Sequence, residues 1–454
     1  MLIDHFNTLL SGGAAVAAKR LHQGLLQSGV ESRLWYASDS SRVKKSAIEL
    51  VAGANPVPWP LHDSSFGVKL KRLARQGLKK IQLRLIRSYY RRGRRMKSGG
   101  FIGVRQSMTT PYSSRFFEGD IVHFHWIGHL IDFPSFFESM PEGLPLVWSL
   151  HDMNPLTGGC SHAGDCDGFT RMCGDCPVLS RPGPRDLSYQ ELAIKHASLQ
   201  RRNVSIIAPS QWMAGMAKRS SLFSHCPIKV IHNPVDMSSF FPEHKRIARQ
   251  NLGLPEEGIC LLYAAESVEV REKGINEFLG VLSRLGKSRD LFGLTFGRGD
   301  VVSSIDGVPI QHLGYLNSIE KMRLAYSAAD IFVIPSHAET ISQTTVEAFA
   351  CQTPAVAFDV GGLPELVHDG QTGFLAPFLN IESMAEKIDW LIEHPDERRN
   401  MGTKALQFAR EGFESKSLIS RYIDFYKEVL NSSSDKKSPR GRQRSGFQVE
   451  GAER

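Results

Sequence analysis

The feature that most constrains the fold is the segment from Ile331 to Phe358, in which two short apolar runs flank a polar loop and a helical stretch. The first run ends before Pro335 and the second ends at Phe358. Such runs predict two buried strands, and the pattern between them predicts a loop followed by a helix. Strand, loop, helix and strand in this order indicate an α/β sheet, in which ligands bind at the carboxyl ends of the strands.

The helix of this segment is expected to begin among Ser342, Gln343, Thr344 and Thr345. Their hydroxyl and amide groups can cap a first helical turn. Backbone N–H groups that lack partners within the helix then point into the loop, where they favour an anion. Ser342, Gln343 and Thr344 are therefore candidate ligand-binding residues.

Two glutamates bracket this helix start, Glu339 in the loop and Glu347 in the helix. A carboxylate in the loop can accept hydrogen bonds from sugar hydroxyls, and one in the helix can hold the two hydroxyls of a ribose. With a diphosphate at the helix N-terminus, these contacts suit a nucleotide sugar. The alternative is that Glu339 caps the loop and Glu347 is a solvated helix residue.

The block from Pro335 to Leu375, which contains Val360-Gly-Gly-Leu-Pro-Glu365, resembles the C-terminal signature of retaining family-4 glycosyltransferases of the GT-B class, also called group 1. The resemblance implies an α/β fold of two Rossmann-like, doubly wound domains that face a cleft. It also implies that Glu339 and Glu347 lie against the donor sugar and the nucleoside. Alternation of strands and helices through both halves of the chain is consistent with this fold.

The length of 454 residues is too great for one ordinary core and fits two domains of about 200 residues each. The first domain should contain a basic insertion, 67–97, and a Cys-rich loop, 159–177. The expected parts are an N-terminal acceptor-side domain (1–234), a C-terminal nucleotide-sugar-binding domain (235–411), a helix that crosses back to the first domain (412–431) and a disordered basic tail (432–454).

Two residue groups of the first half are candidate contacts to substrate. Gly12 and Gly13 precede a helix and let the backbone approach a ligand, although a Gly-Gly turn is more often only a turn. His151 follows the predicted strand 144–150 directly, at the end of the strand that lines the crevice of such sheets. The resemblance implies that the glycines face the donor phosphate and the acceptor, and that His151 lies near the transferred sugar.

Lys273 and Gly274 come just before a helix that begins at Ile275. The resemblance implies that Lys273 grips the leaving diphosphate, with a partner arginine six residues earlier. Ser267 occupies that position, so Arg271 is the nearest substitute. These cations and the helix start after Ser342 would do the work that metal ions do in other transferases, and we therefore predict no catalytic metal.

Four of the seven cysteines lie within one short loop, and they are Cys160, Cys166, Cys173 and Cys176. Four thiolates so close in sequence can hold a tetrahedral Zn²⁺ ion, and the last two have the spacing of a zinc knuckle. Two disulfides or four free thiols are the alternatives. The chain resembles a bacterial exopolysaccharide subgroup of the family with such a loop, which implies a structural or acceptor-shaping role.

The positive charge of the chain is concentrated in one segment. Thirteen of the 55 Lys and Arg residues lie from Lys69 to Lys97, with no acid among them, while the net charge of the whole chain is +8. Leu, Ile and Tyr alternate with these cations, which favours amphipathic helices on an anionic membrane surface. A solvated insertion is the alternative, and no recognition module for nucleic acid accompanies the charge.

No apolar run approaches the ~20 residues that cross a bilayer, and Asp4 and His5 stand where a signal peptide would be apolar. We therefore expect a cytoplasmic protein, peripheral on the inner face of the membrane. The predicted function is retaining transfer of a sugar from a nucleotide diphosphate sugar to a lipid-linked polysaccharide acceptor in exopolysaccharide biosynthesis. The alternatives are a sugar-nucleotide epimerase of the same fold and a non-catalytic membrane-associated scaffold.

Overall fold

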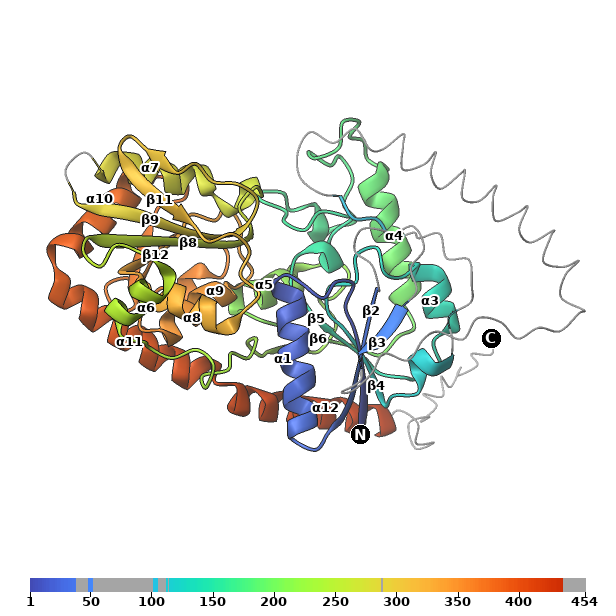
Figure 1. Cartoon of the computed structure of the whole chain (residues 1–454). Coiled ribbons are helices and arrows are strands. Elements are labelled where there is room, and N and C mark those ends of the chain that lie inside the picture. Colours follow the sequence, from blue (N-terminus) through green and yellow to red (C-terminus); the bar gives the residue numbers. More distant parts are fainter. Residues whose placement is uncertain (38–47, 52–100, 105–111, 113, 287–288, 436–454) are drawn as a thin grey trace, which may run out of the picture.

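The computed structural model describes residues 1–37, 48–51, 101–104, 112, 114–286 and 289–435. The predicted basic insertion, 67–97, lies outside the described residues. The described chain forms two α/β domains side by side (Figure 1), each built on a sheet of seven strands.

The first sheet has the strand order β3-β2-β1-β4-β5-β6-β7, and its strands are parallel except for the antiparallel pair β2 and β3. The order reverses beside β1, so that a crevice forms at the carboxyl ends of β1 and β4. The strands are β1 (Leu2–Phe6), β2 (Glu31–Ala37), β3 (Ile48–Val51), β4 (Ile121–Phe124), β5 (Leu146–Ser149), β6 (Val204–Ala208) and β7 (Ile228–Val230).

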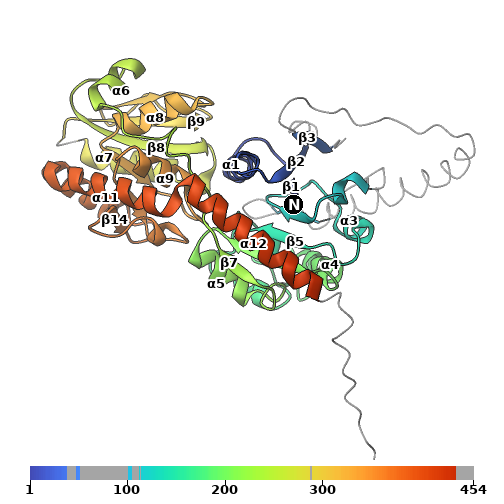
Figure 2. The same ribbon diagram turned by 90° about the horizontal axis from the view of Figure 1, so that it is seen from below.

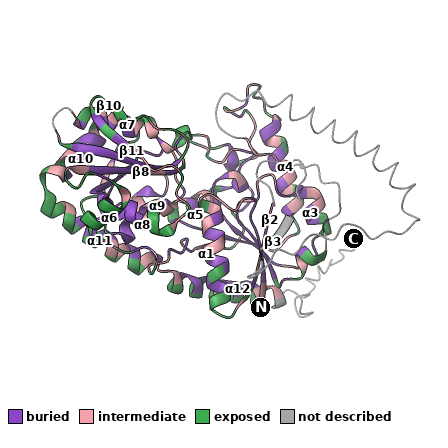
Figure 3. Cartoon of the chain, viewed as in Figure 1, coloured by how far each residue is buried: buried purple, intermediate pink, exposed green. Residues whose placement is uncertain are grey.

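Helices cover both faces of the first sheet. One face packs against α1 (Gly13–Gln27) and α12 (Ser415–Asp435) through a cluster that includes Ile3, Leu21 and Tyr426. The opposite face packs against α3 (Phe133–Ser139), α4 (Leu187–Leu199) and α5 (Gln211–Arg219) in a larger, aromatic-rich core. The central strands β1, β4, β5 and β6 are buried and the outer helix faces are exposed (Figure 3).

The second sheet has the order β10-β11-β9-β8-β12-β13-β14 and is parallel except for β10 and β11. Its order reverses beside β8, which places a second crevice at the ends of β8 and β12. The strands are β8 (Ile259–Ser267), β9 (Leu291–Arg298), β10 (Ser304–Ile305), β11 (Val308–His312), β12 (Ile331–Ile334), β13 (Ala355–Phe358) and β14 (Gly373–Ala376).

Two helix layers also enclose the second sheet. On one face lie α7 (Ile275–Leu285) and α10 (Ile381–Glu393). The other face carries α6 (Lys245–Leu252), α8 (Ile319–Ala328), α9 (Gln343–Ala350) and α11 (Pro395–Phe413). The predicted strand-loop-helix-strand segment corresponds to β12, α9 and β13.

The C-terminal helices connect the two domains. Figure 2, which views the molecule from below, shows α11 running across the second domain and α12 continuing across the first. Ile419 of α12 packs so closely on α1 that a Cβ atom on Gly24 would lie 2.5 Å from it. No helix in the described part of the chain is both long and apolar enough to span a bilayer.

The structure corrects the predicted start of the C-terminal tail. Residues 432–435 continue α12, whereas the sequence predicts a disordered tail from 432. The serine hydroxyls do not break the helix, because Ser432 and Ser433 donate to the carbonyl of Val429, and Ser433 also accepts from Asn203. Residues 436–454 lie outside the described residues.

Candidate active site

A cleft lies between the two domains where their crevices face each other. It consists of three neighbouring cavities that share Gly13 of the first domain and Gln343 of the second. Lys273, Glu339 and Ile341 line two of the three. Apart from Arg271, the donor-site residues that the sequence predicts in both halves of the chain therefore meet in one place, because the segments that carry them follow the carboxyl ends of strands.

The N-terminus of α9 forms the centre of the cleft. Ser342 is the N-cap, and its Oγ accepts a hydrogen bond of 3.3 Å from the N–H of Thr345. Gln343 and Thr344, the first residues of the helix, line the cavities. The helix thus begins where the sequence predicts, with the first N–H groups of its backbone directed to the cleft.

Glu347 is buried, and its solvated-surface interpretation is therefore wrong. Its side chain lines the largest of the three cavities. Arg20 of α1 donates to Oε1 at 2.6 Å, and the hydroxyl of Tyr326 donates to Oε2 at 3.0 Å. Burial, and then the charge of Glu347, hold the pKa of Tyr326 well above its ordinary value, so the phenol remains a donor.

Sequence reasoning missed Arg20 and Tyr326. Arg20 also donates to Oε1 of Gln343 at 3.3 Å, so one side chain of the first domain contacts two residues of α9. The available signal was its position about two turns after Gly13 in the helix that the glycines introduce. That signal places Arg20 on α1 but does not show that α1 faces α9.

The two glycines bring the first domain to this helix. Gly12 adopts φ +88°, a left-handed conformation that glycine tolerates, and α1 begins at Gly13. The carbonyl of Gly13 accepts a 2.6 Å hydrogen bond from Nε2 of Gln343. Both glycines line the cleft.

Lys273 and Glu339 form an ion pair in the cleft, with Nζ 2.7 Å from Oε1. Ser336 donates to the same carboxylate oxygen at 3.1 Å. The turn before α7 holds the lysine there, because Gly274 has φ +81° and a Cβ on it would lie only 1.9 Å from the carbonyl oxygen of Pro335. A larger residue at 274 would push Lys273 away from Glu339.

Arg271 does not reach the cleft, which corrects its assignment as the second cation. It is exposed at the start of the 3₁₀ turn Arg271–Lys273 and lines none of the three cavities. With three residues per turn, positions two apart lie on different sides, so Lys273 faces the cleft and Arg271 faces away. The further cations that line the cleft are Lys19 and Arg20.

His151 lines the cavity at the other end of the cleft, together with Trp126 and His162. Its carbonyl accepts from the hydroxyl of Thr340 at 2.8 Å, and its ring nitrogen Nε2 lies 3.0 Å from Nδ1 of His125. Burial lowers the pKa of His151 to about 4, so the imidazole is neutral at physiological pH. It can donate or accept a hydrogen bond there but cannot serve as an acid.

The neighbours of His151 have different roles. Asp152 accepts from Nε1 of Trp126 and from the N–H of Asn154, each at 2.9 Å, and so fixes the loop. His162 was missed by sequence reasoning. It belongs to the Cys-rich loop, so that loop contributes a side chain to the cleft.

Two further contacts join the domains beside the cleft. Glu365 of the second domain accepts hydrogen bonds of 2.7 Å from the N–H groups of Gln211 and Trp212, at the N-terminus of α5. Ser210 of the first domain donates to the carbonyl of Thr340 at 2.8 Å. A carboxylate at a helix N-terminus is a favourable arrangement, and here it joins the two domains beside the cleft.

Similarity to known proteins agrees with this geometry. Residues 245–408 match the family model described as Glycosyl transferases group 1. D-inositol 3-phosphate glycosyltransferase 2 of Catenulispora acidiphila is 30% identical over 320 residues, which cover 64% of this chain and 66% of that protein. The structure of sucrose-phosphate synthase from Thermosynechococcus elongatus aligns with a TM-score of 0.63 and 16% identity over 95% of this chain and all of the other. The chain is a glycosyltransferase with the GT-B fold.

Other relatives align with different shares of the glycosyltransferase chain. The N-acetyl-alpha-D-glucosaminyl L-malate synthase of Bacillus anthracis is 23% identical over 45% of this chain, and the chain spans about half of it, 54%. The Anabaena protein HepE, in complex with UDP and glucose, aligns with a TM-score of 0.58 and 14% identity over 94% of this chain and all of that one. At such identities the structural likeness establishes the fold alone.

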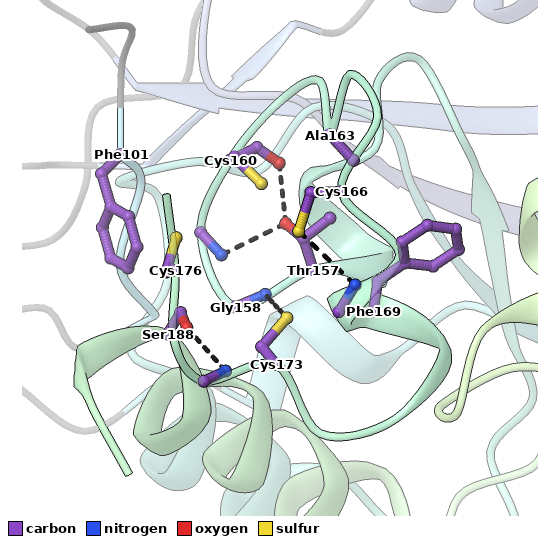
Figure 4. Close-up of a pocket in the computed structure, with 13 residues that line it drawn as sticks. Phe101, Thr157, Gly158, Cys160, Ala163, Cys166, Phe169, Cys173, Cys176 and Ser188 are labelled. Carbon is purple, nitrogen blue, oxygen red and sulfur yellow. Dashed lines mark hydrogen bonds between the residues drawn. The ribbon is translucent and has the colours of Figure 1, made fainter. Parts of the chain in front are cut away.

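The four loop cysteines of the glycosyltransferase surround a single cavity, with Phe101 and Phe169 in its wall (Figure 4). All four are free thiols. Backbone N–H groups of Gly158 and Gly168 lie 3.3 and 3.5 Å from the sulfurs of Cys173 and Cys166. Burial raises the pKa of Cys160 to about 11 and that of Cys173 to about 12, so these thiols are neutral without a metal.

The sulfur atoms of the four loop cysteines do not converge on one point in the structure. Within the described ranges, the group of three or more metal-ligating side chains whose ligand atoms all lie within 4.8 Å is His5, His123 and His125. Zn²⁺ would therefore have to draw the four thiolates inward, and their deprotonation would release protons. Zinc in the cysteine loop stays a prediction.

We expect about one equivalent of Zn²⁺ per chain in protein purified without chelator, measured by elemental analysis. Cys173→Ser should remove most of the metal and lower Tm, whereas Cys226→Ser, at a half-buried thiol outside the loop, should change neither. Because binding releases protons, the affinity for zinc should rise with pH. Less than a tenth of an equivalent in the wild type would contradict the prediction.

Proposed function

We propose that the chain is a retaining glycosyltransferase of family 4 that transfers a sugar from a nucleoside diphosphate donor to a lipid-linked polysaccharide. The observation that carries the proposal is the order of residues along the cleft. Glu347 lies at one end, the start of α9 and Lys273 lie in the middle, and His151 lies at the other end. A nucleotide sugar presents ribose, diphosphate and sugar in the same order.

The nucleoside end of the cleft supports a ribose contact at Glu347. An ionised carboxylate offers about four acceptor positions, and Arg20 and Tyr326 occupy one on each oxygen. Two ribose hydroxyls can therefore donate to Glu347 while both protein bonds remain. Arg20 and Lys19 add positive charge to this cavity, which suits a nucleoside diphosphate.

The middle of the cleft supports stabilisation of the leaving group. As the bond between the sugar C1 and the phosphate oxygen breaks, negative charge grows on the diphosphate. The ammonium of Lys273 and the N–H groups at the start of α9 stabilise that charge. Lysine has three donors, so Lys273 can bind the phosphate and keep its bond to Glu339.

Retention follows from attack on the face that the diphosphate leaves. The acceptor oxygen bonds to C1, the C1–phosphate bond breaks, and the acceptor proton passes to the departing phosphate oxygen. This step needs no carboxylate base. In this proposal Glu339 therefore does not act as a base but orients the donor sugar, and the neutral His151 positions it. Because Lys273 and α9 supply the charge stabilisation, we predict that no catalytic metal takes part.

Donor and acceptor can be tested from what the relatives suggest. HepE was solved with UDP-glucose, so UDP sugars are the first donors to try. The Catenulispora relative carries D-inositol 3-phosphate in its name, so that compound is the soluble acceptor to compare with lipid-linked saccharides. The experiment is to determine by NMR the anomeric configuration of the product. Retention supports the proposal, and inversion would overturn it.

We also propose that the segment from Lys69 to Lys97, which lies outside the described residues, holds the enzyme at the membrane. Each Lys or Arg that reaches an anionic surface contributes on the order of 1 kcal/mol. We therefore expect binding to vesicles that requires anionic lipid and weakens steeply as salt rises. Charge reversal at Lys79, Lys80, Arg84 and Arg87 should abolish binding and leave donor hydrolysis unchanged. Sedimentation with vesicles of phosphatidylcholine alone or with added phosphatidylserine measures this.

A control for this prediction reverses four exposed cations elsewhere, on α11 and α12: Lys404, Arg410, Lys416 and Lys427. Both variants change the net charge equally. A loss of vesicle binding only in the variant of the Lys69 to Lys97 segment therefore identifies that segment as the anchor. Equal loss of binding in the two variants, or equal binding of the wild type to neutral and anionic vesicles, would show that the segment is a solvated insertion.

A further inference from the structure

A row of histidines lies beneath the sugar end of the cleft. His5 is on β1 and His123 is on β4. His125 follows β4, and His151 follows β5. They share the face of the first sheet that α1 and α12 cover, where the same strands carry Ile3, Ile121 and Val147 nearer their starts. His5, His123 and His125 have at most 2% of their surface exposed.

Three of these rings form a hydrogen-bonded chain that ends in the cleft. Nδ1 of His5 lies 3.1 Å from Nε2 of His125, and Nδ1 of His125 lies 3.0 Å from Nε2 of His151. A neutral imidazole has one N–H and one lone pair. His125 must therefore donate at one nitrogen and accept at the other, which leaves only two arrangements for the whole chain.

The rings are neutral, so the choice between these arrangements is discrete. Burial, which excludes the charged form, holds the pKa values of His5 and His125 well below the ordinary range, and that of His151 at about 4. Repulsion from neighbouring histidines, when these are protonated, lowers the pKa values of His5 and His125 further. No ring of the chain carries a second N–H at neutral pH.

The inner end of the chain decides its direction. Nε2 of His5 is fully buried and has no hydrogen-bond partner among the described residues. If the chain donated inward, this atom would be a buried N–H without an acceptor, and unpaired buried donors are rarer on the protein backbone than unpaired acceptors. If the chain donates outward, the atom is a bare lone pair. In the described structure no protein group bonds to Nδ1 of His151, which lines the cleft.

We propose that His5 and His125 are positioning residues that hold His151 in the tautomer with its proton on Nδ1, so that this N–H donates to a hydroxyl of the transferred sugar. Only the identity of the acceptor, a sugar hydroxyl, rests on the proposed function. The tautomer itself follows from the packing of the first domain. In this account His151 recognises the sugar and moves no proton.

His123 supplies a control from the same layer. Its ring lies 4.3 Å from that of His125, but its nitrogens bond to Ser149 and Tyr426 and take no part in the chain. A bound metal is the competing explanation for His5, His123 and His125, whose ligand atoms lie within 4.8 Å of one another. A metal ion would need a lone pair on both Nδ1 of His5 and Nε2 of His125. A hydrogen bond between these two nitrogens places a proton on one of them and so excludes the ion.

The first test needs no substrate. The full chain is labelled with ¹⁵N-histidine, the His151 and His125 signals are assigned through His151→Gln and His125→Asn, and the ring nitrogens are read by NMR at pH 7.5. We expect a protonated Nδ1 and a bare Nε2 on both His125 and His151. A proton on Nε2 of His151, a charged ring, or a stoichiometric metal found by elemental analysis and lost in His5→Gln would overturn the proposal.

The second test uses release of UDP from UDP-glucose, or from whichever UDP sugar the chain hydrolyses. His125→Phe should lower kcat about tenfold, the effect of one lost hydrogen bond, with little change in KM. His125→Asn, which keeps an N–H toward His151, should recover most of the loss, and His123→Gln should stay within about threefold of the wild type. Equal losses in His125→Phe and His123→Gln would show a merely structural role. Thermal melting identifies any variant that does not fold.

The pH profile adds a readout that packing alone would not move. Without the N–H of His125, Nε2 of His151 can hold a proton, so the pKa of His151 should rise. Because the charged ring carries an N–H on Nδ1 as well, His125→Phe should regain part of its lost activity as pH falls from 7 to 5. The other titratable groups that face His151 are Asp152, His162, Lys273 and Glu339, and none of them is changed by the substitution. An unchanged profile would overturn the proposal. If no donor is hydrolysed, the proposed function fails and the NMR result still decides the tautomer.

Discussion

Lys273→Ala should lower turnover by about 100-fold or more, because the lysine acts on charge that grows only in the transition state. The KM for the donor should change less, since the ground-state diphosphate keeps its contacts with the start of α9. Steady-state release of nucleoside diphosphate from the donor measures both constants. The loss includes the cost of leaving Glu339, now without its 2.7 Å partner, in the cleft.

The matched control for this variant is Arg271→Ala. It removes a cation of the same 3₁₀ turn, but one that is exposed and outside the cleft. We expect its kcat to stay within about threefold of the wild type, as for most surface substitutions. Equal defects in the two variants would mean that the turn, rather than the ammonium of Lys273, matters, and a near-normal Lys273→Ala would show that the leaving group lies elsewhere.

Glu347→Ala should weaken binding of the nucleoside diphosphate by about 2–4 kcal/mol, roughly 30-fold or more in Kd, if the carboxylate holds both ribose hydroxyls. Calorimetric titration with UDP measures this directly. The substitution also leaves Arg20 and the buried hydroxyl of Tyr326 without their partner, so melting curves are needed beside the titrations.

Deoxyribose separates the ribose contact from these side effects. The wild type should bind 2′-deoxy-UDP more weakly than UDP, and Glu347→Ala should bind the two alike, because the group that distinguishes them is gone. Tyr326→Phe, which keeps the ring packed in α8 and removes one bond to the carboxylate, should preserve the discrimination. A wild type that does not distinguish the two nucleotides would refute the assignment of Glu347 to the ribose.

The parts of this site that sequence predicts are those set by local chemistry. Ser342 caps α9 because a hydroxyl beside a helix start bonds to the N–H three residues on, and that preference is readable without a structure. The strands around Glu339 and His151 are short apolar runs, and their order implies that both residues lie at carboxyl ends. The fold and the centre of the cleft follow from these rules.

The parts that sequence does not predict depend on contacts between distant segments. Arg20 and Glu347 are separated by 327 residues, and their bond exists only because α1 meets α9 across the cleft. The charge of Arg271 and its nearness in sequence make it a candidate, but the geometry of the 3₁₀ turn directs it outward. The chain from His5 to His151 likewise requires the pairing of β1, β4 and β5, which no local pattern states.

We propose that the cleft binds a nucleotide sugar and transfers its sugar to an acceptor. The most direct measurement is release of nucleoside diphosphate from a panel of nucleotide sugars, with and without a lipid-linked saccharide, for the wild type and Lys273→Ala. We predict that one donor is used, that acceptor raises its rate at least about tenfold, and that Lys273→Ala loses the acceptor-dependent rate. No release from any donor, or conversion of a donor to an isomeric nucleotide sugar without acceptor, would contradict the claim.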